Sequence, residues 1–205
     1  AKGMASADWK NFSKRAAQSQ KKGKIRGVGL STYIECTAWG DGEDVSATLG
    51  KDGVVTVLSG TQANGQGHET AYAQFVSQHL DLPLDRIRVV QGDTAQVRTG
   101  HGTGGSRSIP VGGIASHLAG EALAKNISVL AADVLEASQR DIELVGGDAR
   151  IKGTDRRVSL TDLANSPKAK PEHLKGEGSF TPPDATYPNG THIAEVELDP
   201  DTGVI

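Results

Sequence analysis

The chain has 205 residues, enough for one sizeable domain or two small ones, and only 4% of them are aromatic. A formal net charge of −3 argues against bulk binding to nucleic acid or to anionic membranes. The single cysteine, Cys36, excludes an intrachain disulfide and a cysteine-based metal site, and it fits a cytoplasmic setting. No apolar stretch approaches the roughly 18 residues of a membrane helix.

The first part of the chain predicts one helix followed by strands. Residues 7–22 place Trp9 and Phe12 on one helical face. Seven basic and no acidic residues lie between Lys10 and Arg26, which indicates either a solvated helix face or a contact with a partner chain or a phosphate. Alternation and turn residues then predict an antiparallel run of about three strands, over residues 25–38, 45–50 and 54–60.

The rest of the chain alternates helices, strands and loops. The expected elements are a helix over 68–80, a strand and turn over 85–94, and a long helix over 111–137. They are followed by a hairpin over 141–153, a short helix over 158–165 capped at Ser159 or Thr161, and a strand over 191–199. The helix over 111–137 has the clearest periodicity and should pack against the sheet. Residues 166–190 hold most of the prolines and predict an extended loop.

The C-terminal sequence THIAEVELDPDTGVI indicates a strand, a turn and the first two residues of a partner strand. A natural domain seldom ends inside a hairpin, because the strand edges would stay unpaired. We therefore expect residues 1–205 to be an excised part of a longer polypeptide. A subdivision into 1–150 and 151–205 is one organisation that the sequence allows.

The segment VVTVLSGTQANGQGHET joins a strand to a helix through a turn that contains Gly60, Gly65 and Gly67. A helix N-terminus leaves backbone N–H groups unpaired, and glycines let a ligand approach them, which makes an anion site. Gln66 adds a side chain that donates and accepts hydrogen bonds, and His68 falls in the first helical turn. The alternative is that these glycines only shape a tight turn, since short glycine motifs have many false positives.

The segment RTGHGTGGSRSIP repeats this pattern ahead of the long helix. Ser and Thr hydroxyls bind phosphate oxygens together with backbone amides, and Arg binds them through two parallel hydrogen bonds. Two such loops in one domain favour a ligand with two phosphates or an extended anionic tail. The candidate ligand-binding residues of this second segment are Thr103, Gly104, Gly105, Ser106, Arg107 and Ser108.

Several other patterns carry less weight. The glycines lack the Lys-Ser or Lys-Thr pair of a Walker A loop and the spacing of a dinucleotide fingerprint. The histidines show no metal-ligand spacing, so we expect surface or structural roles, with His101 inside the second segment as the exception. Glu69 suits the helix dipole better than catalysis. Cys36, in an apolar strand, should be a buried small residue.

The segments GTQANGQGHETAYAQFVSQHLDLPLDRIRVVQGDT and GHGTGGSRSIPVGG together resemble the large, molybdenum-binding subunit of the xanthine dehydrogenase/aldehyde oxidase family. The bacterial carbon monoxide dehydrogenase and aldehyde dehydrogenase type is the most similar. GKIRGVGLSTYIECTA and the C-terminal THIAEVELDPDTGVI also resemble family segments in the same order, so that the resemblance spans nearly the whole chain.

The resemblance implies a molybdenum cofactor, molybdopterin, in its cytosine dinucleotide form in bacterial members. It places Gln66 near the oxo ligand of the metal, with no direct protein ligand to the metal. Gly65, Gly67 and His68 would line the same part of the cofactor. The loop formed by Thr103, Gly104, Gly105, Ser106, Arg107 and Ser108 would hold the pterin and the pyrophosphate.

The resemblance also implies an oxidoreductase that hydroxylates an aldehyde, an N-heterocycle or a similar substrate with water, or oxidises carbon monoxide. Iron–sulfur clusters and FAD on partner subunits or domains would carry the electrons away. No segment matches the one that supplies the family's catalytic base, and Glu177 in KGEGSF lies in a different context. This chain alone should therefore be inactive.

We expect an α+β molybdenum-cofactor-binding domain with mixed or antiparallel sheets packed by the long helix. Two alternatives stay open from the sequence. One is a non-catalytic domain that binds a nucleotide or another phosphorylated ligand. The other is an assembly module whose glycine loops are only structural.

Overall fold

The computed structural model describes all 205 residues, and the chain divides into two compact units. The end unit contains residues 1–36 and 186–205, and the central unit contains residues 37–185. Both ends of the chain thus belong to one unit, which differs from a subdivision after residue 150. Such a division depends on strand pairing between distant segments, and this pairing leaves no local signal in the sequence.

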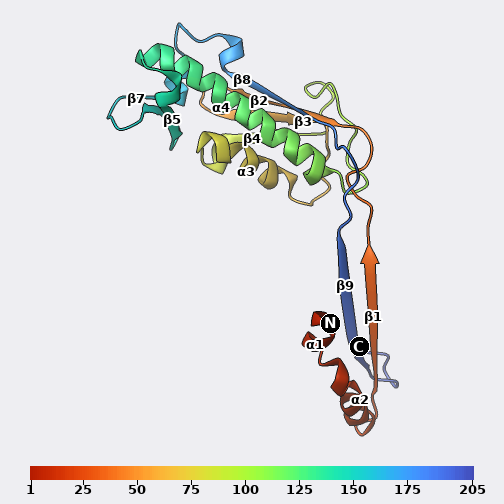
Figure 1. Cartoon of the computed structure of the whole chain (residues 1–205). Coiled ribbons are helices and arrows are strands. Elements are labelled where there is room, and N and C mark those ends of the chain that lie inside the picture. Colours follow the sequence, from red (N-terminus) through yellow and green to blue (C-terminus); the bar gives the residue numbers. More distant parts are fainter. The chain divides into compact units, whose positions relative to one another are not determined.

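The end unit is a two-stranded ribbon with short helices beside it (Figure 1). β1 (Ile25–Ile34) pairs antiparallel with β9 (Asn189–Leu198), with Ile25 opposite Leu198. The prediction that β1 joins the next two strands in one antiparallel run is wrong. Neighbours in sequence pair often but not always, and here the partner of β1 is a strand near the other end of the chain.

The helix expected over residues 7–22 forms over a shorter range, as a 3₁₀ turn (Trp9–Asn11) that runs directly into α2 (Phe12–Gln20). An additional short helix, α1 (Lys2–Ser6), lies before it and is separated from it by a break. The break falls at Asp8, whose φ of 46° is left-handed. A non-glycine residue in this conformation cannot continue a right-handed helix, so the chain changes direction there.

Part of the basic run forms ion pairs within the end unit. Arg15 Nη2 lies 2.6 Å from Glu195 Oε2, and Arg26 Nη1 lies 2.8 Å from Glu195 Oε1. Arg26 Nη2 lies 2.7 Å from Glu197 Oε2, to which Ser19 Oγ also donates a hydrogen bond. These contacts attach α2 to the ribbon, so that these two arginines are neither simply solvated nor free for a phosphate.

We expect the Glu195 ion pairs to make the stability of the end unit decrease at acidic pH. The hydrogen bond from Arg15, with help from Arg26, lowers the pKa of Glu195 from 4.5 to about 2. Because the folded-state pKa is the lower one, this contribution is fully present above pH 4.5 and disappears as the pH falls through about 2.

The difference in denaturant midpoint between the wild-type chain and Glu195→Gln should therefore be constant above pH 4.5. It should shrink to nothing as the pH falls toward about 2. Exposed Glu172→Gln serves as the control and should show no such difference at any pH. A difference between wild type and Glu195→Gln that stays the same down to pH 2 would contradict the assignment.

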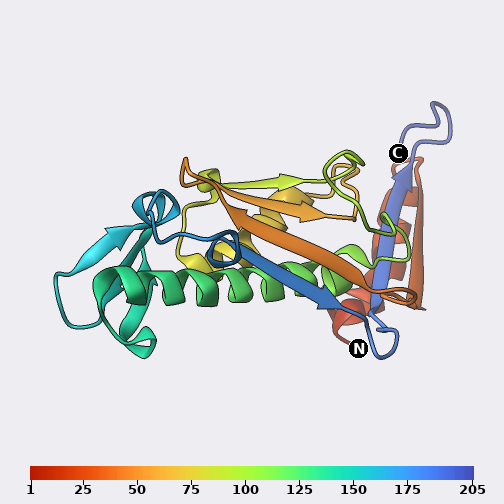
Figure 2. The same ribbon diagram turned by 90° about the horizontal axis from the view of Figure 1, so that it is seen from above.

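The central unit contains a four-stranded mixed sheet, covered on one face by α3 and α4 (Figure 2). β2 lies between β3 and β8 and is antiparallel to both, whereas β4 is parallel to β3. Mixed sheets packed by a long helix were expected, and this expectation is confirmed. The bounds of these elements are β2 (Glu43–Leu49), β3 (Val55–Ser59), α3 (His68–Leu80), β4 (Ile87–Val90), α4 (Ile114–Leu135) and β8 (Lys175–Phe180).

β8 lies inside the segment 166–190, which the sequence predicted as loop. Its alternation is hidden because Gly176 and Gly178 occupy the two buried positions. A Cβ atom on Gly176 would lie 2.2 Å from the carbonyl oxygen of Ala119, and one on Gly178 would lie 2.1 Å from that of Ala115. The backbone of α4 therefore rests directly on the strand, which only glycine permits.

We expect Gly178→Ala to destabilise the central unit strongly. The added methyl group meets helix backbone rather than a mobile side chain, so the strand and α4 must separate. Overpacking of this kind costs about 1–3 kcal/mol or more. Denaturant unfolding of the chain measures it, with the exposed neighbour Ser179→Ala as control. Equal midpoints for the two variants would show that α4 can move away at little cost.

The remaining elements sit at the C-terminal end of α4 (Figure 1). A small antiparallel sheet consists of β5 (Ile142–Val145), β6 (Asp148–Ile151) and β7 (Arg157–Ser159). The next helix, α5 (Leu160–Ala164), begins with the predicted cap, since the Ser159 side chain accepts a hydrogen bond from the Asp162 amide. Further 3₁₀ turns lie at Leu84–Arg86, Gln139–Asp141 and Pro171–His173.

The core of the central unit lies between the sheet and the two long helices. α3 begins and ends as predicted, and α4 is preceded by a π-helical segment at Ser108–Gly113. No helix has the length and the apolar content that crossing a membrane requires. The fully or nearly fully buried core residues include Val45, Ala47, Leu49, Val55, Val57, Val76, Leu80, Ala115, Ala119, Leu123, Ile127 and Leu130.

Candidate functional site

The two glycine-rich segments meet at one edge of the sheet. The first glycine loop (residues 60–67) follows β3, and the second glycine loop (residues 98–108) follows β4 and its turn. Because β3 and β4 are parallel neighbours, their carboxyl ends lie at the same edge. A Cβ atom on Gly60 would lie 2.2 Å from the Cα of Gly100, so the two loops touch through backbone alone.

Hydrogen bonds join the two loops into one platform. The Gly102 amide donates to the Gly60 carbonyl at 3.0 Å. The Thr103 hydroxyl donates to the Gln62 carbonyl at 2.7 Å and accepts from the Gln62 amide at 3.0 Å. The Thr103 hydroxyl therefore both donates a hydrogen bond to Gln62 and accepts one from it, as the backbone of a paired strand would.

A buried ion pair lies under this platform. The side chain of Glu43 is 0% exposed and that of Arg107 is 7% exposed, and Arg107 Nη1 lies 3.0 Å from Glu43 Oε2. The other carboxylate oxygen accepts the Gly60 amide at 2.9 Å. In the sequence, Glu43 falls between the strands expected over 25–38 and 45–50, and nothing in its surroundings there indicated a buried carboxylate.

The Arg107 guanidinium forms its hydrogen bonds with groups inside the protein. Besides Glu43, its guanidinium donates to the carbonyl of Gly102 at 3.1 Å and to those of Asp41 and Gly42 at 2.8 Å. The sequence indicated that the Arg107 side chain binds phosphate directly. This geometry gives the side chain a different role, because these partners hold it beneath the second loop.

Buried hydroxyl groups form a second link between the loops. Thr61 Oγ1 lies 2.9 Å from the Tyr72 hydroxyl, which donates to the Ser108 carbonyl at 2.8 Å. The Ser108 hydroxyl in turn lies 2.9 Å from Thr103 Oγ1. Burial is the main cause that raises the pKa of Tyr72, so the phenol stays protonated and keeps donating. α3 is thereby attached to the second loop.

The side chain of His68 points into the protein. It is buried, it stacks on Tyr72 with ring centroids 5.3 Å apart, and its Nδ1 lies 3.4 Å from Gln91 Nε2. Burial is also the main cause that lowers the pKa of His68, so the ring is neutral at pH 7. What His68 offers to a ligand is its backbone N–H in the first turn of α3.

The outer surface of the platform is made of exposed backbone. Gly65 and Gly67 have φ angles of 94° and 80°, and no atom lies within 4 Å of where a Cβ would be. Gly67 precedes α3 without a side-chain cap, so the first amides of the helix have no side-chain acceptor. Gly104, Gly105 and Ser106 of the second loop are also exposed.

Gln66 is exposed, and its side chain folds over its own loop. Its Oε1 accepts the Asn64 amide, and its Nε2 lies 3.4 Å from the Gln62 carbonyl. The long Nε2 contact is weak, so this side chain is able to turn toward a ligand at small cost.

A cavity of about 490 Å³ opens beside the first loop, between Gln62, Glu69 and Gln91. The buried Gln91 Oε1 has no hydrogen-bond partner, while Nε2 of the same amide contacts Thr61 and His68. A buried polar atom without a hydrogen-bond partner carries an energetic cost, so Gln91 is an unusual side chain at this edge of the sheet. The sequence did not single out Gln91.

Trp39 is a second residue that the sequence did not single out. Its ring lies against the second loop, and a Cβ atom on Gly105 would lie 2.9 Å from Trp39 Nε1. The amide of Ala38 also donates to the Gly105 carbonyl at 3.1 Å. Since 60% of Trp39 is exposed, it provides a large flat surface next to Gly105 and Ser106.

Other candidates lie away from the platform or differ from expectation. Cys36 is exposed, so the expectation of a buried cysteine is wrong. His79 and His117 form a pair with 3.0 Å between ring nitrogens, which fits the structural role expected for them. His101 lies 3.4 Å from an exposed carboxylate oxygen of Asp41.

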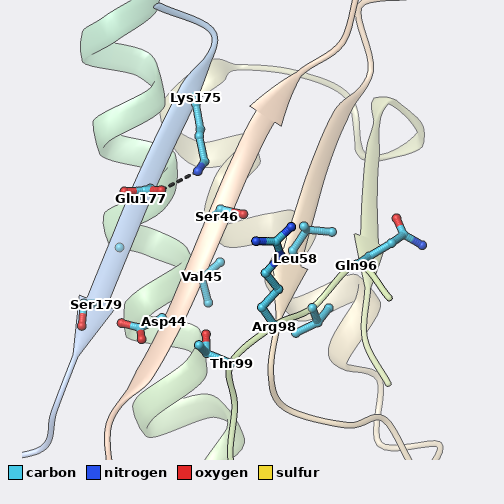
Figure 3. Close-up of a pocket in the computed structure, with 12 residues that line it drawn as sticks. Asp44, Val45, Ser46, Leu58, Gln96, Arg98, Thr99, Lys175, Glu177 and Ser179 are labelled. Atoms are coloured by element: carbon cyan, nitrogen blue, oxygen red, sulfur yellow. Dashed lines mark hydrogen bonds and ion pairs between the residues drawn. The ribbon is translucent and has the colours of Figure 1, made fainter. Parts of the chain in front are cut away.

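A larger cavity lies elsewhere, on the face of the sheet opposite the helices. Figure 3 shows this groove of about 600 Å³ along β8, β2 and β3, with Glu177 paired to Lys175 at 2.5 Å. Of the second loop only Arg98 and Thr99 reach it. The candidate cofactor residues do not line it, so volume does not identify the site here.

Comparisons with known proteins show the family of this chain. The family model described as molybdopterin cofactor-binding domain matches residues 2–205. The 6-hydroxypseudooxynicotine dehydrogenase complex subunit gamma of Paenarthrobacter nicotinovorans is 32% identical, over 94% of this chain and 26% of that protein. The carbon monoxide dehydrogenase large chain of Afipia carboxidovorans is 31% identical, over 93% of this chain and 26% of that protein.

The crystal structure of a Cu,Mo-CO dehydrogenase in the carbon monoxide reduced state has the same fold. It superposes with a TM-score of 0.79 at 30% identity, over 99% of this chain and 28% of that chain. The chain thus spans about a quarter of the length of the relatives that it matches.

Proposed function

Because the chain belongs to the molybdopterin cofactor-binding domain family, we propose that its two glycine loops hold the molybdenum cofactor of a larger oxidoreductase. The whole enzyme would hydroxylate an aldehyde, an N-heterocycle or a similar substrate with water, or oxidise carbon monoxide. The cofactor, when bound, supplies the redox centre for this chemistry. Residues 1–205 would be one part of its large subunit, excised from a longer polypeptide.

The observation that carries this proposal is the shared platform of the two loops. Hydrogen bonds and backbone contact make one surface from two glycine-rich segments that are far apart in sequence. The N-terminus of α3 opens onto it without a side-chain cap. Such a surface suits an extended ligand with several anionic oxygens better than a single small anion.

Each predicted residue takes a role that its surroundings allow. The backbone amides of Gly65, Gly67 and His68 would bind anionic oxygens at the start of α3. Gln66, freed from its own loop, would direct its amide at the reactive end of the cofactor, near the oxo ligand of the metal.

In the second loop, exposed Gly104, Gly105 and Ser106 would contact the pterin and the pyrophosphate. Thr103, Arg107 and Ser108 are bonded to the protein itself, so they would hold this loop in shape rather than touch the ligand.

Further parts of the proposal concern the whole enzyme. The cofactor would be the cytosine dinucleotide form of molybdopterin. Partner subunits or domains would carry iron–sulfur clusters and FAD, and the enzyme would work in the cytoplasm. The catalytic base would lie outside these residues, since Glu177 is paired with Lys175 in the groove on the opposite face of the sheet. The isolated chain would be inactive.

Molybdenum content of the parent polypeptide, purified in its native complex without chelators, tests the proposal. Plasma mass spectrometry should find close to one molybdenum atom per chain, and acid release should yield one cytidine nucleotide per metal. A preparation without molybdenum, from cells whose other molybdenum enzymes are loaded, would favour the alternative of a domain that binds only a phosphorylated ligand.

A further inference from the structure

One buried carboxylate, that of Glu43, contacts both glycine loops. Its Oε1 accepts the Gly60 amide of the first loop at 2.9 Å. Its Oε2 pairs at 3.0 Å with Arg107, which belongs to the second loop. The residue begins β2, and alternation along this strand turns Glu43 inward and Asp44 outward.

Arg107 carries this link further into the second loop. It donates to the Gly102 carbonyl at 3.1 Å, while the Gly102 amide donates to Gly60 at 3.0 Å. The contacts from Gly60 to Glu43, to Arg107, to Gly102 and back to Gly60 form a closed ring. Each loop is therefore fixed to the other through the carboxylate as well as directly.

We propose that Glu43 is a positioning residue that sets the separation of the two glycine loops and thereby determines how firmly the cofactor is retained. The inference rests on the proposed function for its second half, cofactor retention. Its first half, the coupling of the loops through Glu43, concerns only residues of this chain.

The chemistry of the side chain explains why a carboxylate stands here. Both of its partners are donors, one an N–H of the backbone and the other a guanidinium. A carboxylate offers an acceptor to each, whereas a glutamine amide of the same shape offers one acceptor and turns an NH₂ group toward the other donor. Glu43→Gln must therefore release one side of the ring. Glu43→Asp keeps both acceptors on a shorter stem.

Hydrogen exchange of the intact complex, made in cells without molybdate, measures the coupling. Glu43→Gln should speed exchange of the ordered amides in both loops about 10- to 100-fold, because a charge-assisted hydrogen bond is lost. The β5–β6 hairpin (residues 142–151) should exchange as in the wild type. Asp44→Asn, the outward neighbour, should change neither loop, and Glu43→Asp should lie between wild type and Glu43→Gln.

Molybdenum content of the same variants, grown with molybdate, measures retention. Glu43→Gln should lose at least ~10-fold more metal than wild type on dialysis, Glu43→Asp less, and Asp44→Asn none. Faster exchange in one loop only, or equally throughout the central unit including the hairpin, would overturn the inference. Unchanged exchange in a folded Glu43→Gln would overturn it as well.

The two proposals fail in different ways. If the wild-type complex holds no molybdenum while exchange in both loops still responds to Glu43→Gln, the proposed function is wrong and the coupling stands. If the wild type holds molybdenum and Glu43→Gln keeps it as firmly, the inference is wrong and the proposed function stands. If Glu43→Gln does not fold, Glu43→Asp decides between these outcomes by the same two measurements.

Discussion

Gln66→Ala should lower the turnover number of the intact enzyme about 100-fold while the molybdenum content stays near that of the wild type. The magnitude is that expected when one oriented hydrogen-bond donor is removed from a reacting centre. The Gln66 side chain hydrogen-bonds to Asn64 and Gln62 of its own loop and not to Glu43, so its removal leaves the ring of hydrogen bonds around Glu43 intact.

The measurement compares the rate of electron-acceptor reduction with the metal content of each preparation. The substrate is whichever aldehyde, N-heterocycle or carbon monoxide the parent oxidises. Gln74→Ala is the matched control, an exposed glutamine on α3 that should leave turnover unchanged. Full activity of Gln66→Ala would favour the alternative in which the glycine loops are only structural. A parallel loss of metal would move Gln66 from a catalytic to a retention role.

Arg107→Ala, unlike Gln66→Ala, should lose the cofactor, and it should also lower the stability of the chain. Removing the guanidinium leaves the fully buried Glu43 carboxylate without its charge partner and three carbonyls without their donor. Breaking a buried ion pair in this way costs about 3–5 kcal/mol. The second loop then loses its shape, and we expect most of the molybdenum to be lost during purification.

The controls separate the charge of Arg107 from its geometry. Arg107→Lys keeps the charge but not the planar fork that reaches several acceptors, so metal retention should be intermediate. Arg140→Ala removes an exposed arginine beyond the C-terminal end of α4, whose Nε lies 3.9 Å from Asp141 Oδ1, and it should retain the cofactor. An Arg107→Ala enzyme with full metal content and stability would show that Arg107 does not hold the loop.

Local sequence signals predicted the backbone of the two loops, whereas they did not predict how several side chains are oriented. Two glycine-rich turns ahead of helices were recognisable because positive φ angles and helix N-termini depend on nearby residues only. Which way a side chain points depends on the whole fold. Arg107 was predicted as a phosphate contact from its chemistry, and the family resemblance placed His68 beside the cofactor, but both side chains are buried. Glu43, Gln91 and Trp39 gave no local signal, because their importance arises only from what packs against them.

The sequence by itself determined the elements with regular periodicity, the long helix α4 and the helix α3 with its N-terminus at His68. It also determined the two glycine loops, since glycine there relieves a steric constraint that is local. Only the tertiary structure decided the pairing of β1 with β9 and the place of β8, whose glycines remove the hydrophobic alternation where α4 rests on it. It also decided that one buried carboxylate joins both loops, because burial and charge pairing are properties of the packed chain and not of any segment.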